Sequence, residues 1–511
     1  MNSVPPTAAL VLDGQPLTLS EIESVASGFR LVTIAPEAIA RVAQSRQVIE
    51  SILETGQIVY GVNTGFGKLA DVRIPAGRLA QLQTNLVRSH ACGLGEPFSE
   101  AESRAMLLLR ANVLAKGLSG IRTELLQLLV AMLNAGVHPI IPAKGSVGAS
   151  GDLAPLAHLA LVVIGEGEAT FQGRRQPGAE ALAAAGLAPL PLAAKEGLAL
   201  LNGTQAMTAV GALTVAHAGR LAQIADLAGA MSLEALMGTP VAFDPRIHLA
   251  RPHPGQLASA ANLTEILAGS QIRESHRSRS VDPRVQDAYC LRCMPQVHGA
   301  ARGVLAHVTN ILETESGSAT DNPLVFAAER ETEAEVLSGG NFHGAPLSYA
   351  FDYAAIALTD LASISERRID RLINPDINEG LPAFLCADAG LSSGYMIAHV
   401  TAAALLNECK VLAHPSSTDS VPTSGGKEDH VSMGMTGALK LRQIVQNVEV
   451  ILAIEMMCAA QGLDYRQPLQ PGPAVARAHA TIRALVPHLD EDRILAPDIE
   501  VIAEAIRHRQ F

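Results

Sequence analysis

The chain has 511 residues, more than a single hydrophobic core comfortably organises, so we expect at least two subdomains. Hydrophobic residues make up 48% of it and aromatic residues 3%, with no Trp, which favours an Ala- and Leu-rich helical core over packed β-sheets. The net charge of −12 argues against nucleic acid as a partner.

Neither a secretory signal nor a membrane-spanning segment is evident. The first residues lack the basic region of a signal peptide, and no apolar stretch reaches the roughly 18 residues that a bilayer requires. The cysteines are scattered without secretory context, at Cys92, Cys290, Cys293, Cys386, Cys409 and Cys458. We therefore expect a cytoplasmic protein with reduced thiols and no membrane partner.

The first part of the chain predicts short helices separated by loops rich in Gly and Pro. A helix is expected to begin at Pro36 and end at Gly56. Ser99 and Glu102 form the spacing of a capping box, and Gly117 is placed to end the helix that follows. A third helix spans 123–136, and hairpin-like pieces are expected around 71–75 and 170–175.

Beyond residue 200 the pattern predicts long helices of Ala and Leu. They are expected at 202–237, from 265 onward, and at 286–313, 347–372, 395–413, 438–461 and 497–508. The fold class is accordingly mainly α, an elongated bundle of long helices with a smaller N-terminal globular domain. We place the domains at 1–200, which holds the glycine-rich loop described next, and 201–511, the C-terminal helical bundle.

The most informative segment is Gly148-Ala149-Ser150-Gly151-Asp152-Leu153. Glycines on both sides of Ala-Ser allow backbone turns that a β-carbon would forbid. Asp152 is a good helix N-cap, and Pro155 still falls in the first helical turn. Ser150 is therefore expected at the positive end of a helix, where negative charge is stabilised. Taken alone, the segment is equally well explained as a glycine-rich turn that caps a helix.

The segment resembles the signature of the ammonia-lyase family that forms its own prosthetic group, 4-methylidene-imidazol-5-one (MIO). In that family the Gly nitrogen attacks the Ala carbonyl and two waters are lost. The resemblance implies that Ala149, Ser150 and Gly151 form this group, that Asp152 assists its formation, and that no metal or diffusible cofactor is involved. A small residue, an eliminable hydroxyl and an unhindered nitrogen suit that chemistry.

Further segments between about residues 50 and 465 resemble the same family, and each supplies a candidate site residue. They are YGVNTGFGKLA with Tyr60, NLVRSHACGLG with His90, LLNGTQA with Asn202, QDAYCLRC with Gln286, Tyr289 and Arg292, GGNFHG with Phe342, and GGKEDHVSMG with Glu428. Individually, most have simpler explanations: Asn202-Gly203 is typical of a turn, and a lone histidine is commonly a core residue. Their joint presence and order favour membership of the family.

The resemblance implies a role for each residue in removing ammonia from a free amino acid. Arg292 would bind the substrate carboxylate in a bidentate pair, with Asn202 as a neutral hydrogen-bond partner. Tyr289 and Gln286 would orient the amine and the carboxylate, and Phe342 would pack beside the prosthetic ring. Tyr60, on a glycine-rich lid loop, and Glu428 are the alternatives for the group that removes the β-proton.

Two positions indicate the substrate. Ser89-His90 and the run from Lys427 to His430 match the histidine-specific enzymes of the family, whereas members with aromatic substrates differ at both places. Glu428 and His90 can hydrogen-bond an imidazole, while a carboxylate facing a phenyl ring would be costly. We therefore expect conversion of L-histidine to trans-urocanate and ammonia, with a tyrosine or phenylalanine ammonia-lyase or aminomutase as the alternative. Lys427 departs from the Gln common in histidine enzymes.

Other classes of protein remain possible at this point. Lys144, Ser146 and Ser150 could form the Ser-Lys arrangement of a hydrolase. Cys290 and Cys293 could bind zinc with His298, although a fourth ligand is lacking. A catalytically inactive scaffold is disfavoured by the intact candidate residues. The family resemblance also implies a homotetramer whose active sites are shared between subunits.

Overall fold

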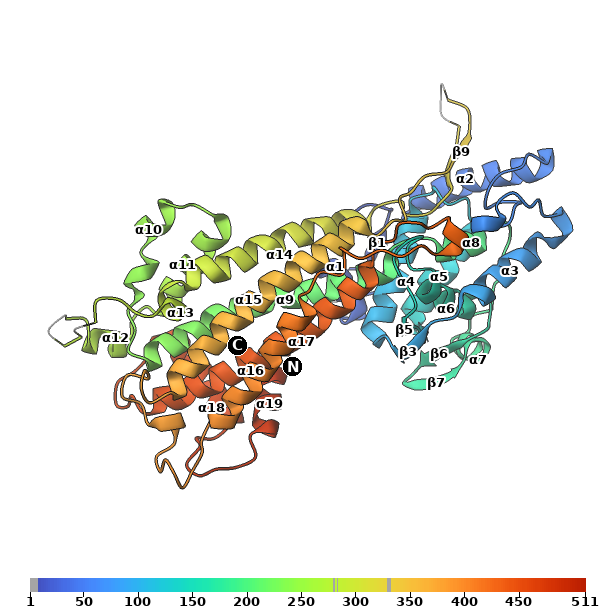
Figure 1. The fold of residues 1–511 in the computed structure, drawn as a ribbon. Coiled ribbons are helices and arrows are strands. Elements are labelled where there is room, and N and C mark those ends of the chain that lie inside the picture. Colours follow the sequence, from blue (N-terminus) through green and yellow to red (C-terminus); the bar gives the residue numbers. More distant parts are fainter. Residues whose placement is uncertain (1–7, 279–280, 283, 329–331) are drawn as a thin grey trace. The chain divides into compact units, whose positions relative to one another are not determined.

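The computed structural model describes residues 8–278, 281–282, 284–328 and 332–511 (Figure 1). The described chain is mainly α-helical, which confirms the predicted fold class. It forms two compact units, each assembled from three stretches of chain. Unit 1 contains Met1–Ala216, Thr309–Phe351 and Pro415–Leu439, and unit 2 contains His217–Val308, Asp352–His414 and Lys440–Phe511. The boundary proposed near residue 200 falls within unit 1.

Unit 1 combines short helices with small sheets. Its helices are α1 (Leu19–Ala26), α2 (Pro36–Thr55), α3 (Leu79–His90), α4 (Glu100–Ala115), α5 (Thr123–Ala135), α6 (Leu153–Val163), α7 (Gly178–Ala184) and α8 (Glu196–Leu201). Its strands are β1 (Leu10–Leu12), β2 (Val32–Ile34), β3 (Leu94–Pro97), β4 (His138–Pro139), β5 (Pro142–Lys144), β6 (Glu168–Phe171), β7 (Arg174–Pro177), β8 (Leu324–Phe326) and β9 (Glu335–Leu337).

The sheets are small and mostly antiparallel. β1 pairs with β2 in parallel, with Leu10 opposite Val32, and α1 connects these two strands. The antiparallel pairs are β3 with β5 and β8 with β9, and β6 lies between β4 and β7 in a three-stranded sheet. The hairpin expected at 170–175 is formed by β6 and β7. The piece expected at 71–75 contains one antiparallel bridge, between Thr64 and Arg73, instead of a regular strand.

Local capping signals place the early helices correctly. α2 begins at Pro36 and ends before Gly56, which adopts the left-handed conformation at φ 71°. The capping box of α4 is present, since the Ser99 hydroxyl accepts from the Glu102 amide and the Glu102 side chain accepts from the Ser99 amide. α5 ends before Gly136 at φ 80°.

Unit 2 contains only helices among its described regular elements. They are α10 (Pro245–Leu249), α11 (Pro254–Ile266), α12 (Gln271–Ser275), α13 (Tyr289–Arg292), α16 (Met396–Leu412), α18 (Pro473–Leu485) and α19 (Ala496–Arg507), with short 3₁₀ turns. Four longer helices contribute residues to both units: α9 (Gln205–Ala235), α14 (Met294–Ser316), α15 (Ala345–Ile373) and α17 (Gly434–Asp464).

Two helix predictions beyond residue 200 were wrong, and α18 was missed. The helix expected to begin at residue 265 is absent, since α11 begins at Pro254 and ends at Ile266. The helix expected at 286–313 is broken at Cys293 into α13 and α14. Pro295 accounts for the break, because a proline inside a continuous helix lacks a donor and its ring clashes with the carbonyl four residues earlier.

A buried ionic cluster joins the long helices inside unit 2. Both Glu455 oxygens accept from Arg368, at 2.6 and 2.8 Å, and one accepts from Ser232. Arg368 also contacts His298, which bonds Asp226 at 2.7 Å. All four charged or titratable side chains are fully buried. Because a buried charge without its partner is costly, this cluster fixes how α9, α14, α15 and α17 pack.

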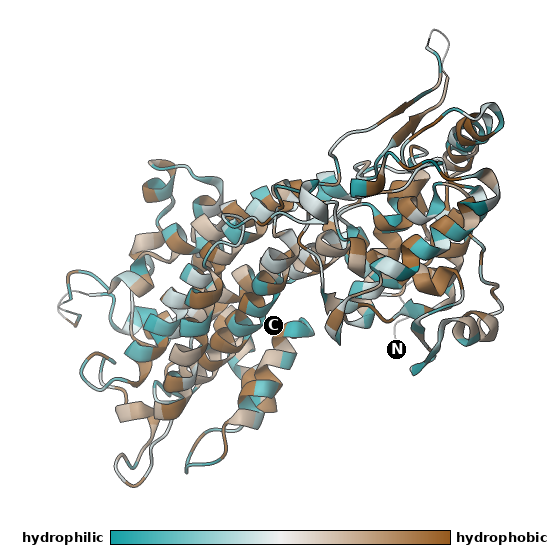
Figure 2. Ribbon diagram, turned by 45° about the vertical axis from the view of Figure 1, so that its right-hand side comes forward, coloured by the Kyte–Doolittle hydropathy of each residue, from teal (hydrophilic) through white to brown (hydrophobic). Residues whose placement is uncertain are grey.

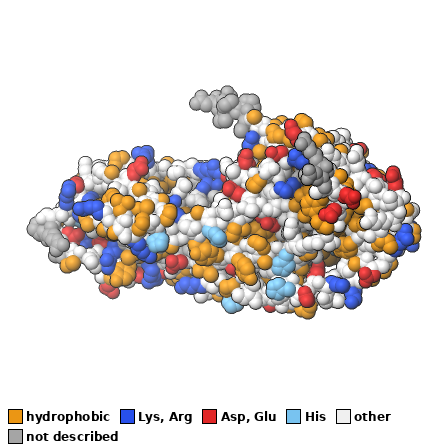
Figure 3. Space-filling model, turned by 90° about the horizontal axis from the view of Figure 1, so that it is seen from above, with side chains coloured by type: hydrophobic (Ala, Val, Ile, Leu, Met, Phe, Trp, Pro, Cys, Tyr) orange, Lys and Arg blue, Asp and Glu red, His pale blue; other side chains and the backbone are white. Residues whose placement is uncertain are grey.

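Apolar residues recur along the helices of both units (Figure 2), and the buried ones form the core of each unit. α17 is the one described helix that is both long and apolar enough to cross a bilayer, and 83% of its most apolar window is buried inside the fold. That burial is typical of a core helix. On the face drawn in Figure 3, acidic and basic side chains are interspersed with many apolar ones.

Candidate active site

The Ala149-Ser150-Gly151 turn is built against the Asn202-Gly203 turn. Gly151 adopts φ 74°, and the Asp152 amide donates to the Gly203 carbonyl at 2.8 Å. A β-carbon on Gly151 would lie 2.1 Å from that carbonyl oxygen, so no residue larger than glycine fits. Gly148 is equally constrained at φ 67°, and its carbonyl accepts from the Ser432 hydroxyl at 2.9 Å.

Asp152 directly precedes α6, but its side chain does not cap that helix, which corrects the N-cap prediction. Its carboxylate instead accepts from the Ser146 hydroxyl at 2.7 Å and from the Met207 amide at 2.8 Å. Met207 lies in the first turn of α9, so the carboxylate satisfies an amide of a different helix. Burial raises the pKa of Asp152 to about 6.

Asn202 holds the turn from the other side. Its side-chain amide donates to the Ser150 carbonyl at 2.8 Å, and its own carbonyl accepts from Arg110 at 2.9 Å. Arg110 is fully buried, and burial lowers its pKa to about 10. Sequence analysis missed Arg110, although an arginine inside the apolar run of α4 could have marked a buried polar role.

The Ser150 hydroxyl points to Glu428. It donates to one carboxylate oxygen at 2.5 Å, while the other oxygen accepts from the Thr423 hydroxyl at 2.6 Å. Thr423 and Glu428 also form an antiparallel bridge across a tight turn. Gly425 and Gly426 adopt φ 62° and 82° in this turn, which explains why the segment is rich in glycine.

Two adjoining cavities of about 250 and 470 Å³ open at the Ser150 turn. Both are lined by residues from distant parts of unit 1: Tyr60, Gly67, Ser150, Asn322, Phe342, Ser424 and Glu428. His90 and Asn202 line the smaller cavity, and Lys427 lines the larger one. The structure thus brings together Tyr60, His90, Ser150, Asn202, Phe342 and Glu428 of the predicted set.

His90 is held in a defined orientation at the end of α3. Its Nδ1 lies 2.8 Å from the Leu86 carbonyl and 3.0 Å from the Ser89 hydroxyl. A carbonyl can only accept, so Nδ1 must carry a proton, and a neutral ring then has Nε2 as an acceptor. The ring so oriented lines the smaller cavity.

The loop that carries Tyr60 is closely packed. The Asn63 side chain accepts from the Val59 amide at 2.9 Å and donates to the Gln57 carbonyl at 2.7 Å. Gly61 adopts φ 74°, and a β-carbon there would approach Leu198 to 2.8 Å. These contacts place the Tyr60 side chain on the cavity wall.

Gln286, Tyr289 and Arg292 belong to unit 2, and none of them lines either cavity. The Tyr289 side chain is 70% exposed, and the Arg292 guanidinium stacks on its ring at 4.5 Å. Nε of Arg292 is buried and has no hydrogen-bond partner among the described residues. Tyr289 is therefore exposed on unit 2, and the Nε–H of Arg292 can still donate a hydrogen bond.

The hydrolase and zinc alternatives find no support in these contacts. Ser146 and Ser150 donate to carboxylates, and Lys144 lies on β5, in register with Leu94 of β3. His298, which the zinc hypothesis required, donates its Nδ1 to buried Asp226. The described residues include no group of three or more side chains that could bind a metal.

Comparison with known proteins decides the family. Residues 17–484 match the family model described as aromatic amino acid lyase. The chain belongs to this family. A relative named histidine ammonia-lyase, from Koribacter versatilis (strain Ellin345), is 55% identical over 98% of both chains.

Solved structures of aromatic amino acid lyase relatives share the whole fold. The crystal structure of histidine ammonia-lyase from Trypanosoma cruzi has a TM-score of 0.90 at 44% identity, covering 98% of this chain and 94% of that one. Tyrosine aminomutase from Streptomyces globisporus has a TM-score of 0.94 at 40% identity, covering 98% and 97%. The fold is therefore common to members with different substrates, and the substrate must be inferred from identity and from the site.

Proposed function

We propose that the chain catalyses the non-oxidative deamination of L-histidine to trans-urocanate and ammonia. The 55% identity to the relative named histidine ammonia-lyase, over nearly the full length of both chains, carries this proposal. The structurally similar tyrosine aminomutase is 40% identical, so the tyrosine or phenylalanine alternative is less well supported.

His90 and Glu428 suit an imidazole substrate. Both side chains line the smaller cavity, and the Glu428 carboxylate is a hydrogen-bond acceptor there. An imidazole N–H of the substrate can donate to Glu428, whereas a phenyl side chain would displace water from the carboxylate without replacing its hydrogen bonds. That desolvation is costly, so this wall favours histidine over phenylalanine.

We infer that Ala149, Ser150 and Gly151 cyclise to 4-methylidene-imidazol-5-one. The residues present fit that group, because the Gly203 carbonyl leaves no space for a β-carbon on Gly151 and Asn202 holds the Ser150 carbonyl. The group would supply an electrophile that no coded side chain provides. Asp152, Asn202 and Arg110 would hold the turn during cyclisation, and Phe342 would pack beside the ring.

The remaining chemistry requires a base for the β-proton of the substrate. Tyr60 and Glu428 both line the two cavities, so either side chain is positioned to reach a bound amino acid. Glu428 accepts a hydrogen bond from the Thr423 hydroxyl, which is still present after cyclisation removes the Ser150 hydroxyl, and this bond fixes its orientation. That fixed acceptor suits substrate positioning, and it leaves Tyr60 as the proposed base.

We further propose that the active sites are completed between subunits of a homotetramer. Gln286, Tyr289 and Arg292 would bind the amine and the carboxylate of a substrate held in the cavities of a neighbouring subunit. Tyr349, Tyr353 and Ile356 support a helical interface, since they share one face of α15 and are 63%, 50% and 50% exposed. The six cysteines are free thiols, which supports the proposed cytoplasmic location.

The experiment that tests the function measures the products of purified protein with L-histidine, L-tyrosine and L-phenylalanine separately. We expect trans-urocanate and ammonia in equal amounts from histidine, and little product from the other two. Faster turnover of tyrosine or phenylalanine, or formation of a β-amino acid, would instead support the alternative. The Ser150→Ala variant is the matched control and should be inactive with all three.

A further inference from the structure

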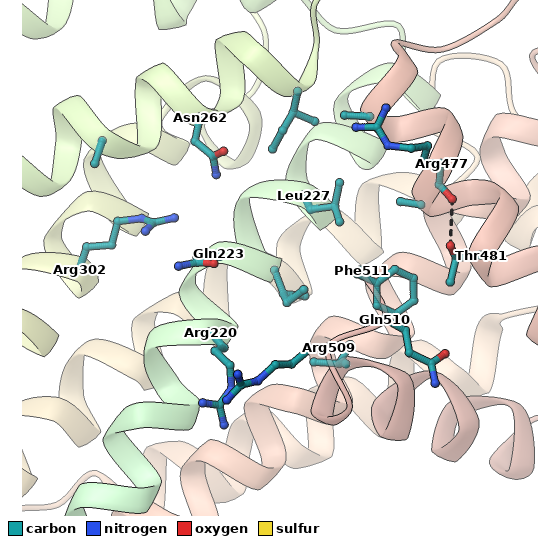
Figure 4. A pocket seen from close by; sticks show the side chains of 16 residues that line it. Arg220, Gln223, Leu227, Asn262, Arg302, Arg477, Thr481, Arg509, Gln510 and Phe511 are labelled. Atoms are coloured by element: carbon teal, nitrogen blue, oxygen red, sulfur yellow. Dashed lines mark hydrogen bonds between the residues drawn. The ribbon is translucent and has the colours of Figure 1, made fainter. Parts of the chain in front are cut away.

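A cavity in unit 2 is separate from the candidate active site. It has a volume of about 800 Å³, within the range of small-molecule sites (Figure 4). Its wall is formed by α9, α11, α14, α18, the end of α19 and the residues that follow it. Apolar side chains such as Leu227 and Ile506 contribute part of the wall.

Arginine dominates the charged lining. Arg220, Arg302 and Arg477 come from three different helices, and Arg509 follows α19. Figure 4 shows Arg302 and Arg477 entering the space from opposite sides. No Asp or Glu is among the described residues that line it. Four cationic side chains around one space are notable in a chain whose net charge is −12.

Arg302 is held in place by hydrogen bonds within unit 2. One of its terminal nitrogens donates to the Ala222 carbonyl at 3.0 Å and to Asp226 at 2.5 Å. Its Nε is buried and has no hydrogen-bond partner in the described part of the chain. Asp226 pairs with Arg302, and Arg220, Arg477 and Arg509 add further guanidinium groups to the wall.

The same carboxylate also positions a neutral donor. Asp226 accepts from the Asn262 side chain at 2.9 Å, and from Ser259 and His298 at 2.7 Å each. Asn262 and Arg302 are therefore both held on the cavity wall by one fully buried group. Fixed donors bind an anion with little further loss of side-chain entropy.

We propose that this cavity binds a small molecule that carries two or more phosphate or carboxylate groups. Guanidinium groups match the planar oxygens of both kinds of anion, and several of them around one space favour a multiply charged ligand. The amides of Gln223, Asn262 and Gln510 can bind its neutral polar atoms, and Leu227 and Ile506 can contact a short carbon skeleton. The site is independent of the proposed lyase reaction.

The test is calorimetric titration of the assembled protein with citrate and, separately, with pyrophosphate at constant ionic strength. We expect saturable binding of at least one of them. The Arg477→Ala/Arg509→Ala variant, which changes two exposed side chains, should bind it at least about tenfold more weakly, because two charge-assisted donors are lost. Binding is measured without substrate, so its outcome is separate from lyase activity.

The matched control is the Arg246→Ala/Arg251→Ala variant, which removes two exposed charges of unit 2 that do not line the cavity. It should bind as the unaltered protein does. Binding of citrate alone would identify a carboxylate site, and binding of pyrophosphate alone a phosphate site. Absence of saturable binding of both, or equal weakening in the two variants, would overturn the proposal.

Discussion

The hydroxyl of Ser150 donates to the carboxylate of Glu428 at 2.5 Å, across a separation of 278 residues in the chain. This bond joins the turn that we propose to cyclise to the residue that we propose to recognise the imidazole. Glu428 therefore contacts both the precursor of the prosthetic group and the substrate pocket.

Replacing Glu428 by Gln should separate these two roles. Gln keeps an acceptor for Ser150, so we expect the prosthetic group to form. The imidazole of the substrate loses a charged acceptor, which is worth about 1.5–3 kcal/mol, or roughly 10- to 150-fold in kcat/KM. Steady-state kinetics with histidine measure this, and intact mass reports the prosthetic group. An unchanged kcat/KM would contradict the role of Glu428 in recognition.

Gly151→Ala should destabilise the turn by a steric clash, and Gly186→Ala is the matched control without that clash. Gly186 adopts φ 73°, close to the 74° of Gly151, but a β-carbon there would meet nothing within 4 Å. We expect Gly186→Ala to cost only the strain of the left-handed conformation, about 1–2 kcal/mol. Gly151→Ala should destabilise the protein more, since its β-carbon would overlap the Gly203 carbonyl.

Thermal unfolding measures both glycine variants. Equal losses of stability would mean that the Gly151 turn can move away from Gly203, contrary to the packing described above. Activity gives a second comparison, because Gly186→Ala should remain active whereas Gly151→Ala should not.

Asp152 should make stability depend on pH in a defined direction. Burial raises its pKa from 3.8 to about 6, so the folded state holds its proton more tightly than the unfolded state does. Its contribution to stability is present below about pH 4 and is lost as the pH rises through about 6. The raised pKa corresponds to roughly 3 kcal/mol of stability.

The side chain introduced by Asp152→Asn cannot titrate. The melting temperature of the variant minus that of the parent should therefore increase as the pH rises from 4 to 7. Both proteins should carry Ser150→Ala, which keeps the turn uncyclised in each. A difference in melting temperature that stays constant over this range would show that Asp152 does not carry the shifted proton.

Subunit complementation tests the shared site. Ser150 lines the cavities, whereas Arg292 lies in unit 2 outside them. Mixed assembly of the inactive Ser150→Ala and Arg292→Ala chains should restore activity, to about one quarter of the unaltered level if the two residues come from different subunits. If the mixture is no more active than the separate variants, both residues of a working site come from one subunit.

Local signals predicted much of the fold. The capping box at Ser99 and the glycines at 56 and 136 set helix ends correctly, because capping depends on residues close in sequence. The break before Pro295 and the helix α18, which begins at Pro473, were missed because the prediction followed the apolar pattern and ignored these prolines. Each of these prolines lies near a helix start, where its fixed φ favours helix formation.

The site could be predicted only in part. Tyr60, His90, Ser150, Asn202, Phe342 and Glu428 were identified by motif, and the structure brings them together. The partner of the Asp152 carboxylate and the role of Arg110 were missed, since both depend on contacts about 55 and 92 residues away. Such contacts are set by packing, and one sequence does not display them.

The most direct measurement is the intact mass of the denatured chain, compared with that of its Ser150→Ala variant. If the tripeptide cyclises, the unaltered chain will be lighter than its sequence mass by two water molecules, and the variant will not show this loss. A chain at its full sequence mass would contradict the account, because the proposed deamination would then lack its electrophile.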